Sequence, residues 1–283
     1  MGMAQWDKVF GRMSYHVVYD DTIQDAMTFA SKNGFSRITI AVGLPHLAVE
    51  RMGKGELSQI KKQSERLGIR LNLHAPDDLT LVHSQPSIND AIMSYYSNLI
   101  DIAHEIGAKI ITVHPGTPAS FPTDTESSER RPRKDTELYK EIFEGNLKKL
   151  AGMANGKTRI CIENFGLEGS TIEVLDKCLK DTRLALCWDI PKMYNYKESI
   201  SIKAETQRFL FRNLDRIRQV HLHSIAKGKS HMVIQDGIII FKLYLGMLRD
   251  VDVLDYCIEV RPREKALESR ENLKRMLYGR GVQ

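Results

Sequence analysis

The sequence predicts an α/β protein that folds as a single-domain (β/α)₈ TIM barrel over residues 1–283. Two observations carry this prediction. Eight short apolar runs alternate with longer stretches of helical period, and six successive runs end in a histidine or a carboxylate that a turn or loop follows. Alternating strands and helices indicate a parallel sheet. Eight such units fit the usual barrel size of about 250 residues.

The expected strands are short and apolar, and each is separated from the next by enough chain for a helix or a long loop. They are residues 15–19, 37–42, 69–73, 109–113, 158–162, 183–188, 217–222 and 256–260. No repeat of fixed period competes with the barrel as an explanation of this pattern.

The clearest helix is predicted for residues 87–107. Its apolar residues recur every three or four positions and share one face: Ile88, Ile92, Tyr95, Leu99, Ile102 and Ile106. Ser87 and Asp90 resemble a capping box, and Gly107 resembles a stop signal. Another helix is expected to begin near Thr22.

Composition places few limits on function. The chain is 42% hydrophobic and 27% charged, with a net charge of +5, which is ordinary for a globular protein and only slightly basic. Most basic residues are spread along the chain, but one cluster stands out: Arg130, Arg131, Arg133 and Lys134. Such a cluster favours an anionic partner. The evidence is weak, because a run of charged residues is usually a solvated surface.

Cysteine spacing and hydropathy favour a cytoplasmic protein without a membrane partner. The four cysteines have no CxxC spacing, and three of them, Cys161, Cys187 and Cys257, lie in expected strands. Reduced thiols in the core are therefore expected. The sequence contains neither a signal-like apolar run at its start nor a stretch of about 18 apolar residues that could span a bilayer.

The most informative pattern is the set of polar residues at the ends of the last six strands. The strings LNLHAP, ITVHPG, ICIENFG, LCWDIP, QVHLHS and CIEVRP place these residues in order: His74, His114, Glu163, Asp189, His221 with His223, and Glu259. In a closed barrel the carboxyl ends of all strands surround one cavity. Each residue alone could simply hydrogen-bond a loop, but six together are harder to explain in that way.

Such a cluster of carboxylates and imidazoles predicts a bound divalent cation. Burying several carboxylates at one mouth is costly unless opposite charge compensates them. Mixed oxygen and imidazole ligands suit manganese, zinc, cobalt or iron better than calcium, with magnesium less favoured.

The order and spacing of these motifs resemble the xylose isomerase-like TIM-barrel superfamily. That superfamily includes sugar phosphate isomerases and epimerases and the AP endonuclease family 2, to which endonuclease IV belongs. The resemblance implies that four residues share a metal: Glu163, Asp189, His221 and Glu259. It also implies catalytic roles for Glu163 and Glu259.

The resemblance gives the remaining strand-end histidines less definite roles. His74 and His114 match positions that bind additional metals in the nuclease branch and that only line the pocket in other branches. His223 alternates with His221 on one side of the strand. It is expected to contact the substrate or a metal ligand, or to pack inside the barrel.

Two lysines depart from the nuclease pattern. Lys192 in DIPK stands where that branch has a histidine, and Lys229 stands where it has an acidic residue two positions before His231. His231 thus lacks its usual companions, which argues against a third metal. Either lysine could bind a phosphate or carboxylate or be a solvated loop residue. Arg261 could orient Glu259, reach an anionic substrate or form a structural salt bridge.

Three functions remain open at this point. The first is a metal-dependent isomerase or epimerase of a sugar, sugar phosphate or related α-hydroxy carbonyl compound, with proton transfer by Glu163 and Glu259. The second is an endonuclease IV-like AP endonuclease that hydrolyses phosphodiester bonds in abasic DNA. The third is a barrel that binds a small ligand without catalysis. The sequence does not determine an oligomeric state.

Several residues receive structural interpretations. His16 is placed near the start of the first strand and far from the mouth. Trp188 is expected to face the surrounding helices by alternation. His46, His83 and His104 are expected to be surface or packing residues. The irregular segment 115–134 could close over the substrate as a lid or remain a surface loop.

Overall fold

The computed structural model describes residues 3–118, 136–194, 200–226, 228–235, 237 and 239–279. The long parallel-sheet strands are β1 (Met13–Val17), β2 (Arg37–Ala41), β3 (Arg70–His74), β4 (Ile110–Val113), β5 (Arg159–Glu163), β6 (Ala185–Asp189), β7 (Ile217–Leu222) and β10 (Asp255–Ile258). The helices are α1 (Met3–Phe10), α2 (Ile23–Lys32), α3 (Lys54–Leu67), α4 (Pro86–Ile106), α5 (Thr136–Ala154), α6 (Gly169–Asp181), α7 (Ile200–Arg212), α8 (Phe241–Met247) and α9 (Arg263–Tyr278).

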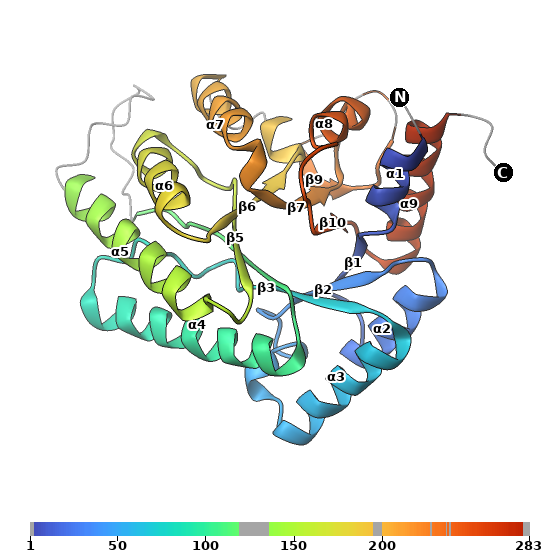
Figure 1. The fold of residues 1–283 in the computed structure, drawn as a ribbon, viewed down its shortest axis with the longest axis horizontal. Helices are drawn as coiled ribbons and strands as arrows, with labels where there is room; N and C mark the ends of the chain where they lie inside the picture. Colours follow the sequence, from blue (N-terminus) through green and yellow to red (C-terminus); the bar gives the residue numbers. More distant parts are fainter. Residues whose placement is uncertain are drawn as a thin grey trace.

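These eight strands form a closed barrel in the order β1-β10-β7-β6-β5-β4-β3-β2. Every neighbouring pair is parallel, and β1 pairs with both β2 and β10, so the sheet has no free edge. The helices surround the barrel (Figure 1). The predicted (β/α)₈ fold is therefore confirmed.

The strand positions agree with the sequence pattern to within a few residues. Strand β7 coincides with the predicted range 217–222, whereas β1 begins at Met13, two residues before its predicted start, and ends at Val17. This shift moves His16 to the carboxyl-terminal part of β1. The interpretation of His16 as remote from the mouth is therefore wrong. Met13 and Ser14 are the first two residues of β1, so His16 is the fourth of its five residues.

Side chains alternate between two packed regions. The main apolar core lies between the barrel and its helices, where the Trp188 ring packs against Phe211 and Tyr244. That contact confirms the predicted orientation of Trp188. A smaller cluster consists of Ile110, Cys161, Ala185 and Cys187. Because Cys161 and Cys187 are two residues before Glu163 and Asp189 in their strands, they face the barrel interior. All four cysteines are free and buried.

Helix boundaries confirm some of the predicted signals and correct one. The Thr22 side chain caps α2 by accepting a hydrogen bond from the Asp25 amide at 3.1 Å. Gly107 ends α4 in the left-handed conformation, with φ of 78°. The capping box predicted at Ser87 is wrong, because α4 begins at Pro86, where the fixed φ of proline starts a helix without needing an amide hydrogen.

The apolar face of α4 is buried over most of its length. Ile92, Leu99, Ile102 and Ile106 are buried against the barrel, as predicted. Ile88 in the first turn is 46% exposed, so the buried face begins about one turn later than the sequence pattern indicated.

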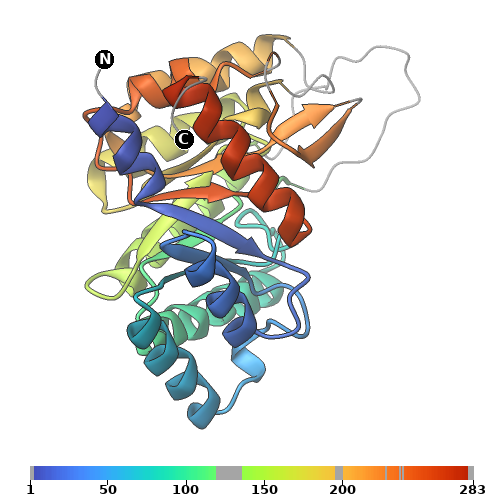
Figure 2. The ribbon, with the colours of Figure 1, turned by 90° about the vertical axis from the view of Figure 1, so that its right-hand side faces the viewer.

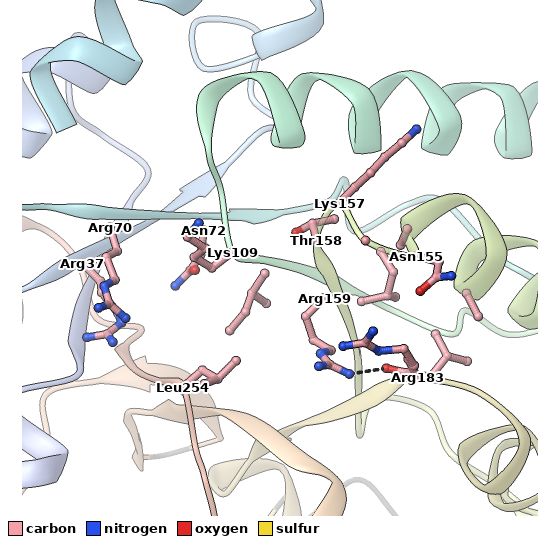
Figure 3. Close-up of a pocket in the computed structure, with 16 residues that line it drawn as sticks. Arg37, Arg70, Asn72, Lys109, Asn155, Lys157, Thr158, Arg159, Arg183 and Leu254 are labelled. Atoms are coloured by element: carbon pink, nitrogen blue, oxygen red, sulfur yellow. Dashed lines mark hydrogen bonds between the residues drawn. The ribbon is translucent and has the colours of Figure 1, made fainter. Parts of the chain in front are cut away.

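The loops at the two ends of the barrel differ. After β7, the antiparallel strands β8 (Ser224–Ala226) and β9 (Lys229–Met232) project away from the barrel (Figure 2). The amino-terminal ends of the strands surround a separate cavity, drawn in Figure 3. Residues 119–135 lie outside the described residues, and with them most of the predicted 115–134 loop and its arginine cluster. None of the described helices is long and apolar enough to cross a bilayer.

Candidate metal centre

The carboxyl ends of the strands enclose a cavity of about 350 Å³. Seven of the residues singled out from the sequence line it: His74, His114, Glu163, Lys192, His231, Glu259 and Arg261. Asp189, His221 and His223 are fully buried beside it, each with 0% exposure. Lys229 lies on β9 with an exposed side chain and is not among the residues that line the cavity.

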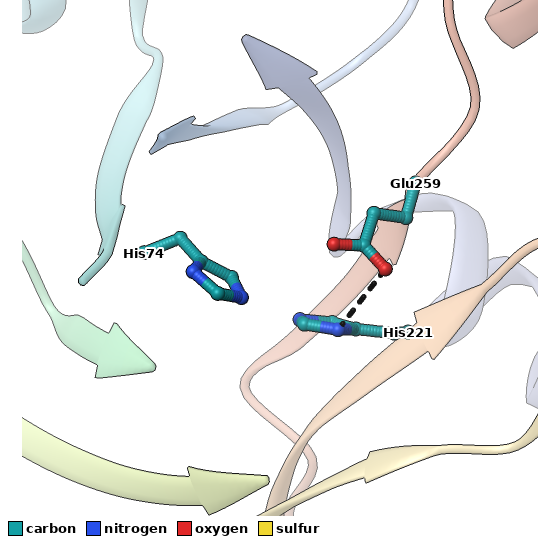
Figure 4. A group of neighbouring side chains, drawn as sticks. All are labelled: His74, His221 and Glu259. Carbon is teal, nitrogen blue, oxygen red and sulfur yellow. Dashed lines mark ion pairs between the residues drawn. The ribbon is translucent and has the colours of Figure 1, made fainter. Parts of the chain in front are cut away.

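The two glutamates approach one imidazole from different strands. Atom Oε2 of Glu163 and atom Oε2 of Glu259 each lie 3.4 Å from Nδ1 of His221. His74 from β3 points toward the same place, as Figure 4 shows for His74, His221 and Glu259. Three buried groups with lone pairs or negative charge therefore converge on His221, although their parent strands are far apart in the sequence.

Electrostatics in this cluster couple the carboxylates to the imidazoles. Burial by itself raises the pKa of Glu163, but the neighbouring His221 and His114 outweigh it and hold that pKa well below its usual range. Burial likewise opposes ionisation of Glu259, and His221 again lowers its pKa. In turn, burial lowers the pKa of His221, but Glu259 and Glu163 more than offset it and raise the pKa to about 10. Without another cation, an imidazolium thus compensates the two carboxylates.

Asp189 is held by the backbone as well as by its charge partners. Its Oδ2 lies 3.3 Å from Nε2 of His223 and 3.8 Å from Nζ of Lys192. The Asn164 side chain accepts a hydrogen bond from the Asp189 amide at 2.6 Å and donates one to the Asp189 carbonyl at 3.1 Å. This pair of bonds joins the ends of β5 and β6, and so fixes Asp189 relative to Glu163.

His74 and His114 both contact Glu163. Their Nε2 atoms lie 3.4 and 3.2 Å from Oε2 of that carboxylate. The Nδ1 atom of His74 lies 2.9 Å from the Ala75 carbonyl, which can only accept, so Nδ1 carries a proton. Asp77 lies 3.5 Å from the same nitrogen. The sequence had assigned no role to Asp77.

His231 enters the site from the projecting strand β9. Its Nδ1 lies 3.1 Å from the Glu259 carbonyl and its ring lies 4.5 Å from the His223 ring. Its φ of 58° is in the left-handed region, which is costly for a residue with a side chain. His223 and Glu259 give His231 two potential co-ligands, although the companions expected from the nuclease pattern are absent.

Cationic and aromatic side chains form the rim. The Nζ atom of Lys192 lies 4.0 Å from Oε1 of Glu163 and 4.4 Å from the centre of the Phe165 ring. That ring in turn stacks on His114 at 4.9 Å. Arg261 lines the cavity, and its buried Nε has no hydrogen-bond partner in the described part of the chain.

The donor set fits a divalent cation. Both ring nitrogens of His221 are buried without a hydrogen-bond partner among the described residues, as are those of His16. Several three-residue groups have ligand atoms within 4.8 Å of one another: His74 with His221 and Glu259, His74 with Asp77 and His114, and His223 with His231 and Glu259. A bound cation would accept lone pairs from imidazole nitrogens that have no hydrogen-bond partner, and its charge would replace the imidazolium charge of His221.

The sequence missed several residues that the barrel brings into the site. His16 lines the cavity, with Nδ1 3.7 Å from Oε1 of Glu259. Burial lowers its pKa well below the usual value, so its ring is neutral. For His16 the signal in the sequence is the period-two alternation that begins at Ser14, and for Asp77 it is an acidic residue three positions after His74. The role of Asn164 had no signal beyond its place next to Glu163.

Sequence comparison identifies the family. A family model described as the xylose isomerase-like TIM barrel matches residues 27–276. The chain belongs to this family. The resemblance that the strand-end motifs suggested is thus confirmed. None of the curated proteins matches the chain in sequence.

Solved structures agree with membership of the xylose isomerase-like family. A D-tagatose 3-epimerase-like protein is 21% identical and has a TM-score of 0.72, with 94% of this chain and 97% of that chain covered. D-psicose 3-epimerase from Clostridium cellulolyticum is 15% identical, with a TM-score of 0.68 and coverage of 94% and 98%. Endonuclease IV from Thermus thermophilus is 16% identical, with a TM-score of 0.65 and coverage of 94% and 99%. At these identities the similarity establishes the shared fold.

Proposed function

We propose that this protein is a divalent-metal-dependent isomerase or epimerase of a sugar, sugar phosphate or related α-hydroxy carbonyl compound. The observation that carries the proposal is the placement of Glu163 and Glu259, each 3.4 Å from the same atom of His221 and both in contact with the cavity. Two carboxylates that reach one point can supply a base that removes a proton from a carbon and an acid that returns one to it. Epimerases among the structural neighbours support this choice.

Glu163, Asp189, His221 and Glu259 would hold the cation, which can be manganese, zinc, cobalt or iron. When bound, it supplies positive charge that stabilises the enediolate oxygens of the substrate. One glutamate removes the proton from the carbon next to the carbonyl, and the other delivers a proton to that carbon for epimerisation, or to its neighbour for isomerisation. His74 and His114 hold Glu163 in place through its Oε2.

The rim residues favour a polar or anionic substrate. Lys192 and Arg261 line the cavity as cations, and the Phe165 ring offers an apolar face beside Lys192. A carbohydrate-like substrate, with or without a phosphate group, suits this combination of hydrogen-bond donors and an aromatic surface.

The first test is the metal content of the protein. We expect about one divalent cation per chain in the wild type, and loss of it in both Glu163→Ala and Glu259→Ala, because each removes a proposed ligand. Elemental analysis of the purified proteins measures this directly. Absence of metal in the wild type, even after reconstitution with manganese, zinc, cobalt and iron, would refute the proposal.

The second test is turnover. Screening ketoses, aldoses and their phosphates by exchange of substrate hydrogen with deuterated water detects proton transfer without knowledge of the product. On any substrate found, Glu259→Gln should lower kcat by about 10² to 10⁴, the usual contribution of a general acid or base. Glu105→Gln, an exposed change on α4, serves as the matched control and should retain full activity. Full turnover by Glu259→Gln would exclude this mechanism.

One observation favours the nuclease as a second candidate. The additional ligand groups around His114 and His231 offer places for more than one cation, and clustered metals are the apparatus of phosphodiester hydrolysis. Two or more metals per chain, together with cleavage of an abasic-site duplex, would support this alternative. No cleavage in the presence of zinc or manganese would eliminate it.

A further inference from the structure

Three barrel strands begin with an arginine. Strands β2, β3 and β5 start at Arg37, Arg70 and Arg159, and each arginine is four residues before the end of its strand. Because side chains alternate with a period of two, Arg70 and Arg159 share the inward face with His74 and Glu163. The arginines therefore lie at the amino-terminal end of the barrel interior, opposite the candidate metal centre.

A cavity of about 340 Å³ opens at this end. Its lining includes four arginines and two lysines, namely Arg37, Arg70, Arg159, Arg183, Lys109 and Lys157, and no aspartate or glutamate among the described residues. In Figure 3, Arg37 and Arg70 lie on one side of the cavity and Arg159 and Arg183 on the other. Lys157 points away toward α4, where it pairs with Asp101 at 2.6 Å.

Two arginines of this cavity have no acidic partner among the described residues, whereas Lys157 is paired with Asp101. Within the described part of the chain, neither Arg70 nor Arg183 forms an ion pair with a carboxylate. Arg159 donates a hydrogen bond to the Arg183 carbonyl at 2.8 Å, which holds its guanidinium without compensating its charge. Burial, followed by the charge of Arg183, lowers the pKa of Arg159, as expected where cations crowd together.

A buried polar group also faces this cavity without a partner. Asn72, two residues after Arg70 on the same inward face, lines the cavity and is 1% exposed. Its Nδ2 has no hydrogen-bond partner among the described residues. An unpartnered buried donor costs about 1 to 3 kcal/mol, which a ligand with acceptor oxygens would recover. Among the arginines of this cavity, Arg37 is the buried one, with 6% exposure.

We propose that this amino-terminal cavity is a binding site for a phosphate group, separate from the candidate metal centre and independent of the reaction proposed there. Guanidinium groups on two sides match the oxygens of a phosphate, which accepts paired hydrogen bonds from each. The Asn72 amide supplies a neutral donor from the barrel interior. Ile110, Leu184 and Leu254 add apolar surface to the lining, so an organic phosphate ester fits as well as the free ion.

The test is isothermal titration of the full-length protein with inorganic phosphate and with phenyl phosphate, at pH 8 and constant ionic strength. We expect saturable binding of one ligand per chain. The double variant Arg70→Gln/Arg183→Gln should bind at least about tenfold more weakly, because it removes two charge-assisted contacts. Both side chains are exposed, so the variant should fold, and its thermal melting curve checks this.

The matched control removes the same charge elsewhere. Arg51→Gln/Lys54→Gln changes two exposed cations near the opposite end of the barrel and should leave binding unchanged. Tighter binding of phenyl phosphate would identify an organic phosphate as the ligand class, and equal binding would identify inorganic phosphate. The proposal is overturned if the wild type shows no saturable binding, or if the folded Arg70→Gln/Arg183→Gln protein binds as tightly as the wild type, which would place the phosphate at another site.

Discussion

The Nε2 atom of His223 lies 3.3 Å from Oδ2 of Asp189, and neither side chain is exposed to solvent. Burial lowers the pKa of His223, but the charge of Asp189 outweighs burial and raises that pKa. The contact in turn holds the Asp189 side chain in position. In a metal site, such partners orient the ligands and tune their basicity.

Neutralising Asp189 should therefore weaken metal binding. Asp189→Asn retains the shape of the side chain but removes its negative charge, and we expect metal affinity to fall by about 10- to 100-fold. Competition with a chelator of known affinity measures the change. Asp181→Asn, at an exposed position at the end of α6, is the control and should bind metal like the wild type. Unchanged affinity in Asp189→Asn would show that Asp189 is not a ligand.

Asn164 should stabilise the site through the backbone. Asn164→Ala removes both hydrogen bonds to the main chain of Asp189 and leaves a buried amide unpaired, at a cost of about 1 to 3 kcal/mol. Chemical denaturation should show this loss, accompanied by weaker metal binding because Asp189 is no longer fixed. Asn155→Ala, at an exposed position, should have little effect. A variant of wild-type stability would contradict this role.

Stability should fall with rising pH because of Asp255. Its side chain accepts hydrogen bonds from Gln219 and Ser14 inside the barrel, but burial outweighs these bonds and raises its pKa. The folded protein thus holds this proton more tightly than the unfolded chain does. The contribution of this proton to the free energy of unfolding is fully present below the pKa of the aspartate in the unfolded chain, near 3.9. It is lost as the pH rises through the pKa of Asp255 in the folded protein.

Asp255→Asn, which cannot ionise, should therefore melt at a higher temperature than the wild type at pH 8, by on the order of a few degrees, and the difference should shrink toward pH 4. Asp252→Asn is the opposite case, because a hydrogen bond from Arg12 lowers the pKa of Asp252. That variant should be slightly less stable at pH 8. A melting difference for Asp255→Asn that does not change with pH would contradict the assignment.

Removing the metal should destabilise the fold. Without a cation, the carboxylates of the centre depend on protonated histidines, and a ligand present at 100 times its dissociation constant adds about 2.7 kcal/mol. Chelation should lower the melting temperature of the wild type, and readdition of the metal should restore it. Glu163→Ala should show no such response. A wild-type melting temperature that neither chelator nor metal changes would argue against a bound cation.

Local pattern determined most of the architecture. Alternation of apolar runs with helical segments was sufficient to predict eight strands, because the period of hydrophobic residues depends only on which faces are buried. The same logic placed Glu163 and Glu259 at one end of the barrel, since the ends of parallel strands must meet there.

Positions that depended on exact strand limits or on distant partners could not be predicted in this way. His16 is an example, because a shift of two residues in the limits of β1 changes its expected place from the start of the strand to the end at the mouth. The contacts of Asn164 with Asp189 and of His231 with Glu259 join segments 25 and 28 residues apart. No local propensity encodes such contacts.

The sequence by itself determined the barrel and the polar residues at its carboxyl-terminal mouth, because both follow from local periodicity and residue order, and the resemblance of the strand-end motifs indicated the family. Tertiary structure decided that both glutamates approach one nitrogen of His221, that Lys229 lies outside the cavity, and that arginines from separate strands meet at the opposite end. These facts depend on how the folded barrel brings distant segments together. The distances between those segments are not encoded in any short stretch of the sequence.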